Sequence, residues 1–304
     1  MSTWILVALS SVALFTTINF IDKYLLEDRL PDSYGVIMIS SIISFCVGII
    51  VWVSIGSPFL PLQYAIPLIA SGLFVICSLA LYFYVLSQTK VSFVNIFFQI
   101  IPIFVAVGAY IGGERMSVIQ IVGATVVIFF CSLLATADST SIKSAQGIPW
   151  RQVGLMLLYD LLWAGSALCV KYVSSQVYFP QIVSYESFGV ALGGLLMFVI
   201  IPKLRTSSRK LIRNVSIPTL LLLCLNEGLL YLLARALLNY AYTLGSASIV
   251  SVLESTQIMF VLIAGAILSL WWPRIFRENT DRKVFIKKIL YALNVIVGIG
   301  LFSR

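Results

Sequence analysis

The chain has 304 residues, a formal net charge of +8 and a mean hydropathy of +1.03, with 60% hydrophobic and only 11% charged residues. Soluble domains carry about 25% charged residues, so the composition excludes an ordinary water-soluble protein and predicts a chain dissolved largely in lipid. Nucleic-acid binding, which a basic chain often indicates, is not favoured because no basic face alternates with exposed aromatic residues.

Apolar segments follow one another along the whole chain, separated by proline, glycine or charged residues. A helix that crosses a bilayer needs about 20 apolar residues, and on this measure the sequence predicts ten transmembrane helices. The first segment has no basic residue before it and no cleavage site, so we interpret it as a retained span. The ten expected spans are 4–21, 34–55, 63–87, 91–112, 117–137, 150–174, 180–202, 216–243, 246–271 and 285–303.

The polar connection 138–149 separates two sets of five expected helices, which divides the chain into a first repeat (1–137) and a second repeat (150–304). Because five is an odd number of crossings, the second copy must lie inverted in the membrane relative to the first. Sequence matches between the halves favour this interpretation, and a shift of 156 positions aligns the two tightest helical hairpins. At that shift Ser92 matches Ser248 and Phe104 matches Phe260; in addition, Lys23 at the end of the first span matches Lys171 at the end of the sixth, and Pro31 before the second span matches Pro180 before the seventh.

The segment IIPIFVAVGAYIGGER (100–115), followed by IVGATVVIFFCSLL (121–134), resembles the EamA family of the drug/metabolite transporter superfamily. The second half departs from this pattern, since Ile258 replaces the proline and a long basic segment replaces the short Gly-Glu exit. The resemblance implies an all-α integral membrane protein with ten transmembrane helices in two inverted five-helix repeats. It also implies a secondary transporter that moves a small organic solute or metabolite by alternating access, through a central cavity between the repeats.

Polar side chains inside predicted spans are expensive to bury in lipid, so each of them needs a partner or a function. Asn95 and Gln99 lie four residues apart on one helix face, while Glu254 and Gln257 lie three apart in the matching span of the second repeat. An inverted repeat brings such helices together near the midplane, where transporters bind their substrates. The alternative is ordinary hydrogen bonding between helices.

Arg235 lies within the eighth expected span and shares a helix face with Asn239. An arginine that faces the bundle could bind a carboxylate or phosphate group of a substrate. The alternative is a structural ion pair with Glu227, Glu254 or Asp160. The sequence leaves both interpretations open.

Buried carboxylates are the candidates for coupling to an ion or a proton, because burial favours the protonated form. They are Asp160, Glu227 and Glu254, whereas Glu186 lies about seven residues into its span, within reach of the interface or a cavity. The complete candidate set for substrate binding or coupling is Asn95, Gln99, Tyr159, Asp160, Trp163, Glu186, Glu227, Arg235, Glu254 and Gln257.

The residues that usually carry enzyme chemistry are missing or scattered. The chain has no histidine, its five cysteines all fall inside apolar segments, and it contains no phosphate-binding Gly-x4-Gly-Lys motif. We therefore expect no metal, no cofactor, no ATP-driven pump and no enzyme. The expected partners are a small-molecule substrate of unknown identity, membrane lipids and a coupling ion or proton; the alternatives are an intramembrane lipid-modifying enzyme and a non-transporting scaffold.

The distribution of basic residues bears on orientation in the plasma (inner) membrane. Sixteen Lys and Arg residues fall in loops opposite the N-terminus and three on its own side, so the positive-inside rule places both termini outside. The resemblance implies the reverse, with both termini in the cytoplasm. The basic segment 203–213 is expected to be a solvated loop near anionic lipid, and Lys171 is expected to extend to the membrane interface.

Overall fold

The computed structural model describes residues 3–28, 34–88, 94, 97–137, 150–261, 264 and 282–302. These residues form helices joined by short turns, and no strand occurs among them. Six of the helices are long and apolar enough to cross a membrane, and four shorter apolar helices accompany them within the described part of the chain. The all-α class of a multi-pass membrane protein follows from these features.

Every expected span contains at least one described helix, although the fourth and ninth are described only in part. The eighth is built from three consecutive elements, because a π-helical turn interrupts it. The count of ten crossings and the inverted relation of the halves stay predictions. The helices are α1 (Thr3–Asp28), α2 (Tyr34–Ser54), α3 (Leu62–Leu86), α5 (Ile101–Ile111), α6 (Val118–Ala137), α7 (Trp150–Val173), α8 (Phe179–Ile200), α9 (Pro202–Asn214), α10 (Ile217–Cys224), the π-helix η1 (Leu225–Leu230), α11 (Tyr231–Leu244), α12 (Ala247–Ser255) and α14 (Arg282–Phe302).

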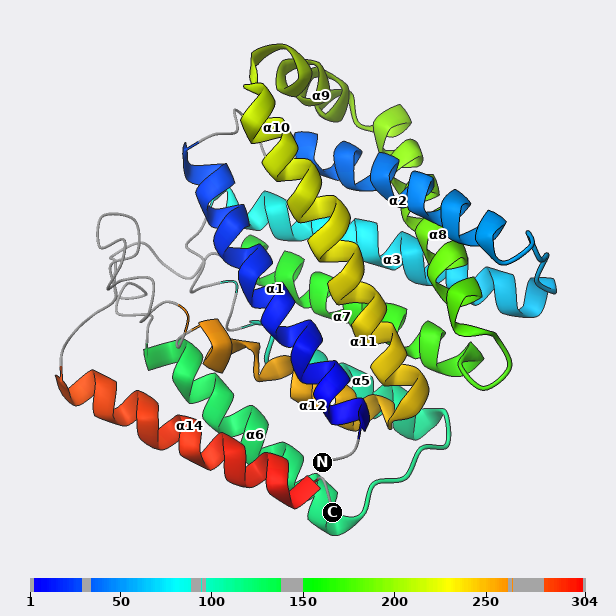
Figure 1. Ribbon diagram of the computed structural model, residues 1–304. Helices are drawn as coiled ribbons and strands as arrows, with labels where there is room; N and C mark the ends of the chain where they lie inside the picture. Colours follow the sequence, from blue (N-terminus) through cyan, green and yellow to red (C-terminus); the bar gives the residue numbers. More distant parts are fainter. Residues whose placement is uncertain are drawn as a thin grey trace.

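The basic segment 203–213 was expected to be a loop, and this prediction is wrong because the segment forms helix α9. Its apolar residues Leu204 and Leu211 are seven positions apart, so they share one helix face, and both are buried. The basic side chains at Lys203, Arg205 and Arg209 are exposed. Helix α9 packs on α2 and α8 and lies across the end of the bundle remote from the two chain ends (Figure 1).

Helix α2 shows how the bundle inverts the pattern of a soluble protein. Its serines Ser40 and Ser44 lie on one face and are buried, whereas Ile42, Phe45 and Ile49 lie on the other and are exposed. Residues four apart share a helix face, so this sequence presents a polar face to the protein and an apolar face to the surroundings. Such an exposed apolar face is stable only against lipid.

The principal helix contacts join the first half of the chain to the second. Helix α3 packs on α7 and α8, α2 on α8, α1 on α11, α5 on α7 and α12, and α6 on α14. At the crossing of α3 and α8 the two backbones lie in close contact, because glycines occupy it on both sides. A Cβ atom on Gly72 would lie 2.1 Å from the carbonyl oxygen of Glu186, and one on Gly189 would lie 2.2 Å from that of Ile69.

Charged side chains fix the turn between α11 and α12. The carboxylate of Glu114 accepts hydrogen bonds from the Ser246 hydroxyl and from the backbone amide of Ala247 (3.0 Å), at the positive end of the α12 dipole. The Nζ atom of Lys171, which was expected to extend to the interface, donates to the carbonyls of Tyr242 (3.1 Å) and Gly245 (2.6 Å) at the end of α11. Both free helix ends are thereby satisfied, which sets the position of α12.

Candidate functional site

A cavity of about 60 Å³ lies among α1, α3, α7, η1, α11 and α12. It has room for a few water molecules, since each needs about 10–15 Å³ of such space. Side chains from both halves of the chain form its walls, and they are aromatic, apolar, amide, hydroxyl or carboxylic. The polar ones are Asn19, Asp22, Tyr82, Tyr159, Trp163, Glu227, Tyr231, Ser251, Glu254, Ser255 and Gln257.

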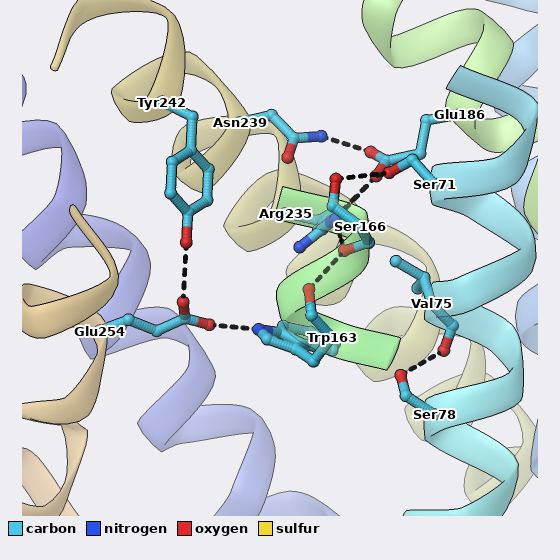
Figure 2. A network of polar contacts seen from close by, with 10 residues as sticks. All are labelled: Ser71, Val75, Ser78, Trp163, Ser166, Glu186, Arg235, Asn239, Tyr242 and Glu254. Atoms are coloured by element: carbon cyan, nitrogen blue, oxygen red, sulfur yellow. Dashed lines mark hydrogen bonds and ion pairs between the residues drawn. The ribbon is translucent and has the colours of Figure 1, made fainter. Parts of the chain in front are cut away.

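Glu254 is held in the cavity wall by hydrogen bonds from two other helices. Trp163 of α7 donates its indole N–H to Oε1 at 2.7 Å, and Tyr242 of α11 donates its hydroxyl to Oε2 at 3.2 Å (Figure 2). Glu254 is buried, with only 9% of its surface exposed. Hydrogen bonding of this kind compensates part of the desolvation of a buried acid.

Two further acids, Asp22 and Glu227, line the same cavity. The sequence analysis identified only Glu227. The amide of Asn226 donates to Asp22 Oδ1 at 2.7 Å and to Glu227 Oε1 at 3.2 Å, and Ser40 donates to Glu227 Oε2 at 2.7 Å. Asp22 was missed because the first span was expected to end at residue 21, whereas α1 continues to Asp28. Its position directly after the expected span 4–21 was the available signal.

The π-helical turn η1 positions Asn226 and Glu227. A π-helix contains more residues per turn than an α-helix, so it shifts the face that the following side chains present, and such turns are frequent at functional sites. Asn226 and Glu227 lie in this turn and are buried, and the Asn226 Oδ1 atom has no partner among the described residues. The irregularity of the eighth span therefore places two polar side chains against α1 and α2.

Arg235 pairs with Glu186, which is not one of the partners expected from the sequence. Its Nε and Nη2 atoms lie 3.3 and 2.8 Å from Glu186 Oε1, and Ser71 and Asn239 also donate to that carboxylate (Figure 2). Glu186 was expected to reach the interface or a cavity; the residue is only 4% exposed and does not line the cavity described above. The prediction that Arg235 and Asn239 share a helix face is confirmed.

The same network extends towards the cavity without entering it. Arg235 Nη2 donates to the Ser166 hydroxyl at 2.7 Å, and its Cζ lies 4.9 Å from the centre of the Trp163 ring. Arg235 is not among the residues that line the cavity, and neither is Glu186. The ion pair thus lies behind the cavity wall, and Trp163 connects the two groups.

Aromatic rings form a continuous surface around the cavity. Tyr159 stacks on Trp163 with ring centres 6.0 Å apart and lies 5.3 Å from Phe98, while Phe15 packs edge-on against both Trp163 and Tyr231. The Tyr231 hydroxyl is buried and has no hydrogen-bond partner within the described structure. The expectation that Tyr159 and Trp163 line a cavity agrees with this arrangement.

The remaining candidates separate into different environments. Gln257 lines the cavity, and Gln99 is buried and donates to the Ser255 carbonyl at 3.4 Å, while Asn95 lies outside the described residues. Asp160 is fully buried, does not line the cavity, and neither of its carboxyl oxygens has a partner among the described residues. The structure therefore brings Glu227, Glu254, Tyr159, Trp163 and Gln257 to one cavity and separates Asp160 from it.

This fold and site define a helical membrane protein that buries several ionisable side chains between its helices. Residues 2–136 match the EamA-like transporter family, which confirms the resemblance inferred from the sequence for the first half of the chain. No curated protein matches the chain. A solved structure titled only "Crystal structure of protein" is 14% identical, covers 99% of this chain and 95% of its own, and superposes with a TM-score of 0.71, a likeness that concerns the fold alone.

Proposed function

We propose that the protein is a secondary transporter that moves a small organic solute or metabolite across the membrane by alternating access, with the cavity as its solute site. The observation that carries this proposal is that helices of both halves contribute buried carboxyl groups to one cavity: Asp22 from the first half, and Glu227 and Glu254 from the second. Buried ionisable groups of this kind mark substrate and ion pathways in membrane proteins.

A contact between equivalent positions of the two halves supports a cavity at their junction. Gln99 donates to the carbonyl of Ser255, and these residues are separated by 156 positions, the same shift that aligns the repeats. Equivalent positions of two related units meet only near the axis that relates them. Transporters with inverted repeats bind their substrates at that place.

The cavity, at about 60 Å³, is too small to hold a metabolite in this conformation. Solute-sized sites generally measure about 300–1,000 Å³, so helices must separate before a metabolite enters. Glu254 is the proposed coupling residue because its hydrogen bonds join α12 to α7 and α11, and protonation or solute binding changes those bonds. In alternating access, such cross-links must form and break in each cycle.

Transport by the reconstituted protein is the direct test. Liposomes are assayed with a metabolite library at two transmembrane pH differences, using wild type and Glu254→Gln. We expect at least one solute to accumulate in a saturable manner, and the variant to lose gradient-driven transport while retaining its unfolding temperature. Stabilisation of the purified protein by phospholipids alone, with no solute carried, would instead favour a lipid-modifying enzyme or a scaffold.

A further inference from the structure

We infer that the cavity selects organic cations, so that the solute carries a positively charged amine or ammonium group attached to an apolar body. This inference rests on the proposed function and specifies the chemical class of its substrate. Three observations support it: the sign of the charges in the cavity wall, the aromatic surface between them, and a polar atom that lacks a partner.

The charged residues that line the cavity are all acidic. Asp22, Glu227 and Glu254 contribute carboxyl groups from α1, η1 and α12, and no lysine or arginine is among the described lining residues. Asp22 and Glu227 share the amide of one asparagine, which carries no charge of its own. The lining therefore offers carboxyl groups to a cation, and no described lining residue compensates the charge of an anion.

Arg235, whose guanidinium contacts the lining residue Trp163, is already paired. It binds Glu186 at 2.8 Å and lies behind Trp163, outside the cavity lining. Its guanidinium is therefore engaged by Glu186 and is not free to bind a ligand in the cavity. This arrangement disfavours the alternative from the sequence, in which Arg235 binds the carboxylate or phosphate of a substrate.

The aromatic walls suit the apolar part of such a solute and its charge at the same time. Seven neighbouring rings line the cavity, and ring faces attract cations through their quadrupoles while their edges pack against apolar groups. The rings are Phe15, Tyr82, Phe83, Phe98, Tyr159, Trp163 and Tyr231.

Tyr231 supplies an independent indication of a ligand. Tyr231 is only 6% exposed and lines the cavity, and its hydroxyl has no hydrogen-bond partner among the described groups. Buried polar atoms are rarely left without a hydrogen bond. Tyr231, Glu227 and Glu254 all line the same cavity, so a polar ligand bound there would supply the partner that this hydroxyl lacks.

Calorimetric titration of the purified wild-type protein in detergent tests the charge selectivity with matched ligands. Choline is compared with its neutral isostere 3,3-dimethylbutan-1-ol, and benzyltrimethylammonium with benzenesulfonate, each against protein-free micelles. We expect each cation to bind at least about tenfold more tightly than its neutral or anionic counterpart. Equal affinity within the isosteric pair, or selective binding of benzenesulfonate, would overturn the inference without needing any variant.

Variants locate the binding site. Asp22→Asn, Glu227→Gln and Glu254→Gln each remove one charge from the cavity lining and are expected to weaken cation binding by about tenfold. Asp160→Asn is the matched control, because it removes a buried carboxyl that lies outside the lining, and it is expected to stay within about twofold of wild type. An equal loss in Asp160→Asn would contradict the proposed location.

Transport and binding distinguish failure of this inference from failure of the proposed function. If the reconstituted protein carries only neutral or anionic solutes, the transporter proposal stands and the cation inference is wrong. If cations bind selectively but no solute crosses the membrane, the cation site stands and the transport proposal is wrong.

Discussion

At the scale of single residues, the structure distinguishes buried charges that are compensated from buried charges that are not. Glu186 receives hydrogen bonds from Arg235, Ser71 and Asn239, whereas Asp160 receives none among the described residues. Removing one partner of a compensated pair leaves the other uncompensated in a low-dielectric interior. Removing an acid that has no partner relieves a penalty, so the two sites should respond in opposite ways.

The ion pair between Arg235 and Glu186 should therefore contribute strongly to stability. We expect Glu186→Gln and Arg235→Met each to lower the free energy of unfolding by about 3–5 kcal/mol, and the double variant to lose less than the sum of both. Unfolding in mixed micelles, followed by circular dichroism, measures these losses. Asp160→Asn serves as the control and should be neutral or stabilising; strictly additive losses for the pair would contradict the interaction.

At the scale of secondary-structure elements, helix crossings and helix ends determine where the site residues lie. Helix α8 carries Glu186 to its partners because Gly72 and Gly189 allow the backbones of α3 and α8 to touch. Helix α12 carries Glu254 to the cavity because its first turn is bound by Glu114. Each arrangement leads to a separate prediction.

The crossing of α3 and α8 should not accept a side chain. In Gly189→Ala the new Cβ atom would meet the Ile69 carbonyl at 2.2 Å, and because a backbone atom cannot rotate away, the helices must separate. We expect a loss of about 1–3 kcal/mol, as for other overpacked interiors. The matched control is Gly154→Ala in α7, where no atom lies within 4 Å of the new Cβ and a gain of about 0.5–1 kcal/mol is expected. Thermal unfolding of both variants measures the contrast.

The cap on α12 should make stability depend on acidity. Burial raises the pKa of the Glu114 carboxyl, but hydrogen bonds from Ser246, Ser248 and Ala247 outweigh it, so that the pKa lies below its ordinary value of 4.5. A group whose pKa is lowered in the folded state stabilises the protein fully above its unfolded pKa. That contribution is lost as the pH falls through the lower folded value.

Comparison of wild type with Glu114→Gln isolates this contribution. The unfolding temperature of wild type should exceed that of the variant at pH 7, and the difference should shrink below about pH 4.5, because the carboxyl is then protonated in the unfolded state. A difference that stays constant between pH 7 and pH 3.5 would contradict the role of Glu114 as a charged cap.

At the scale of the whole molecule, the two described ends of the chain lie at the same end of the bundle, and α9 lies at the other (Figure 1). The exposed basic residues of α9 face away from its buried leucines, as expected for a helix at the surface of a membrane with anionic lipids. The positive-inside rule then predicts that α9 is cytoplasmic and that both termini are outside.

Labelling of single cysteines in intact cells tests this orientation. The five natural cysteines are first replaced, and a cysteine is then introduced at Arg209 in α9 or at Ser175 in the turn between α7 and α8. With a membrane-impermeant maleimide, Ser175→Cys should react in intact cells and Arg209→Cys only after permeabilisation. The opposite pattern would support the orientation implied by the family resemblance, with both termini in the cytoplasm.

The sequence by itself determined that the chain is an integral membrane protein, which segments are apolar helices and which family the first half resembles. Hydropathy and span length are sums over consecutive residues, so they do not depend on neighbours in space. These local rules gave two wrong predictions. The charged segment 203–213 was expected to be a loop but forms α9, since a helix needs only one buried apolar stripe. Asp22 was placed outside the first span because that span was ended with its apolar residues, whereas α1 continues to Asp28.

Only the tertiary structure decided which polar groups meet. Arg235 and Glu186 are 49 positions apart, Glu254 and Trp163 are 91 apart, and Asn226 and Asp22 are 204 apart. The periodicity of a helix indicates which residues share a face, but it does not identify the helix that the face meets. That choice depends on how the helices pack, down to the glycines that let two backbones touch, and it separates the acids of the cavity from the buried ion pair behind its wall.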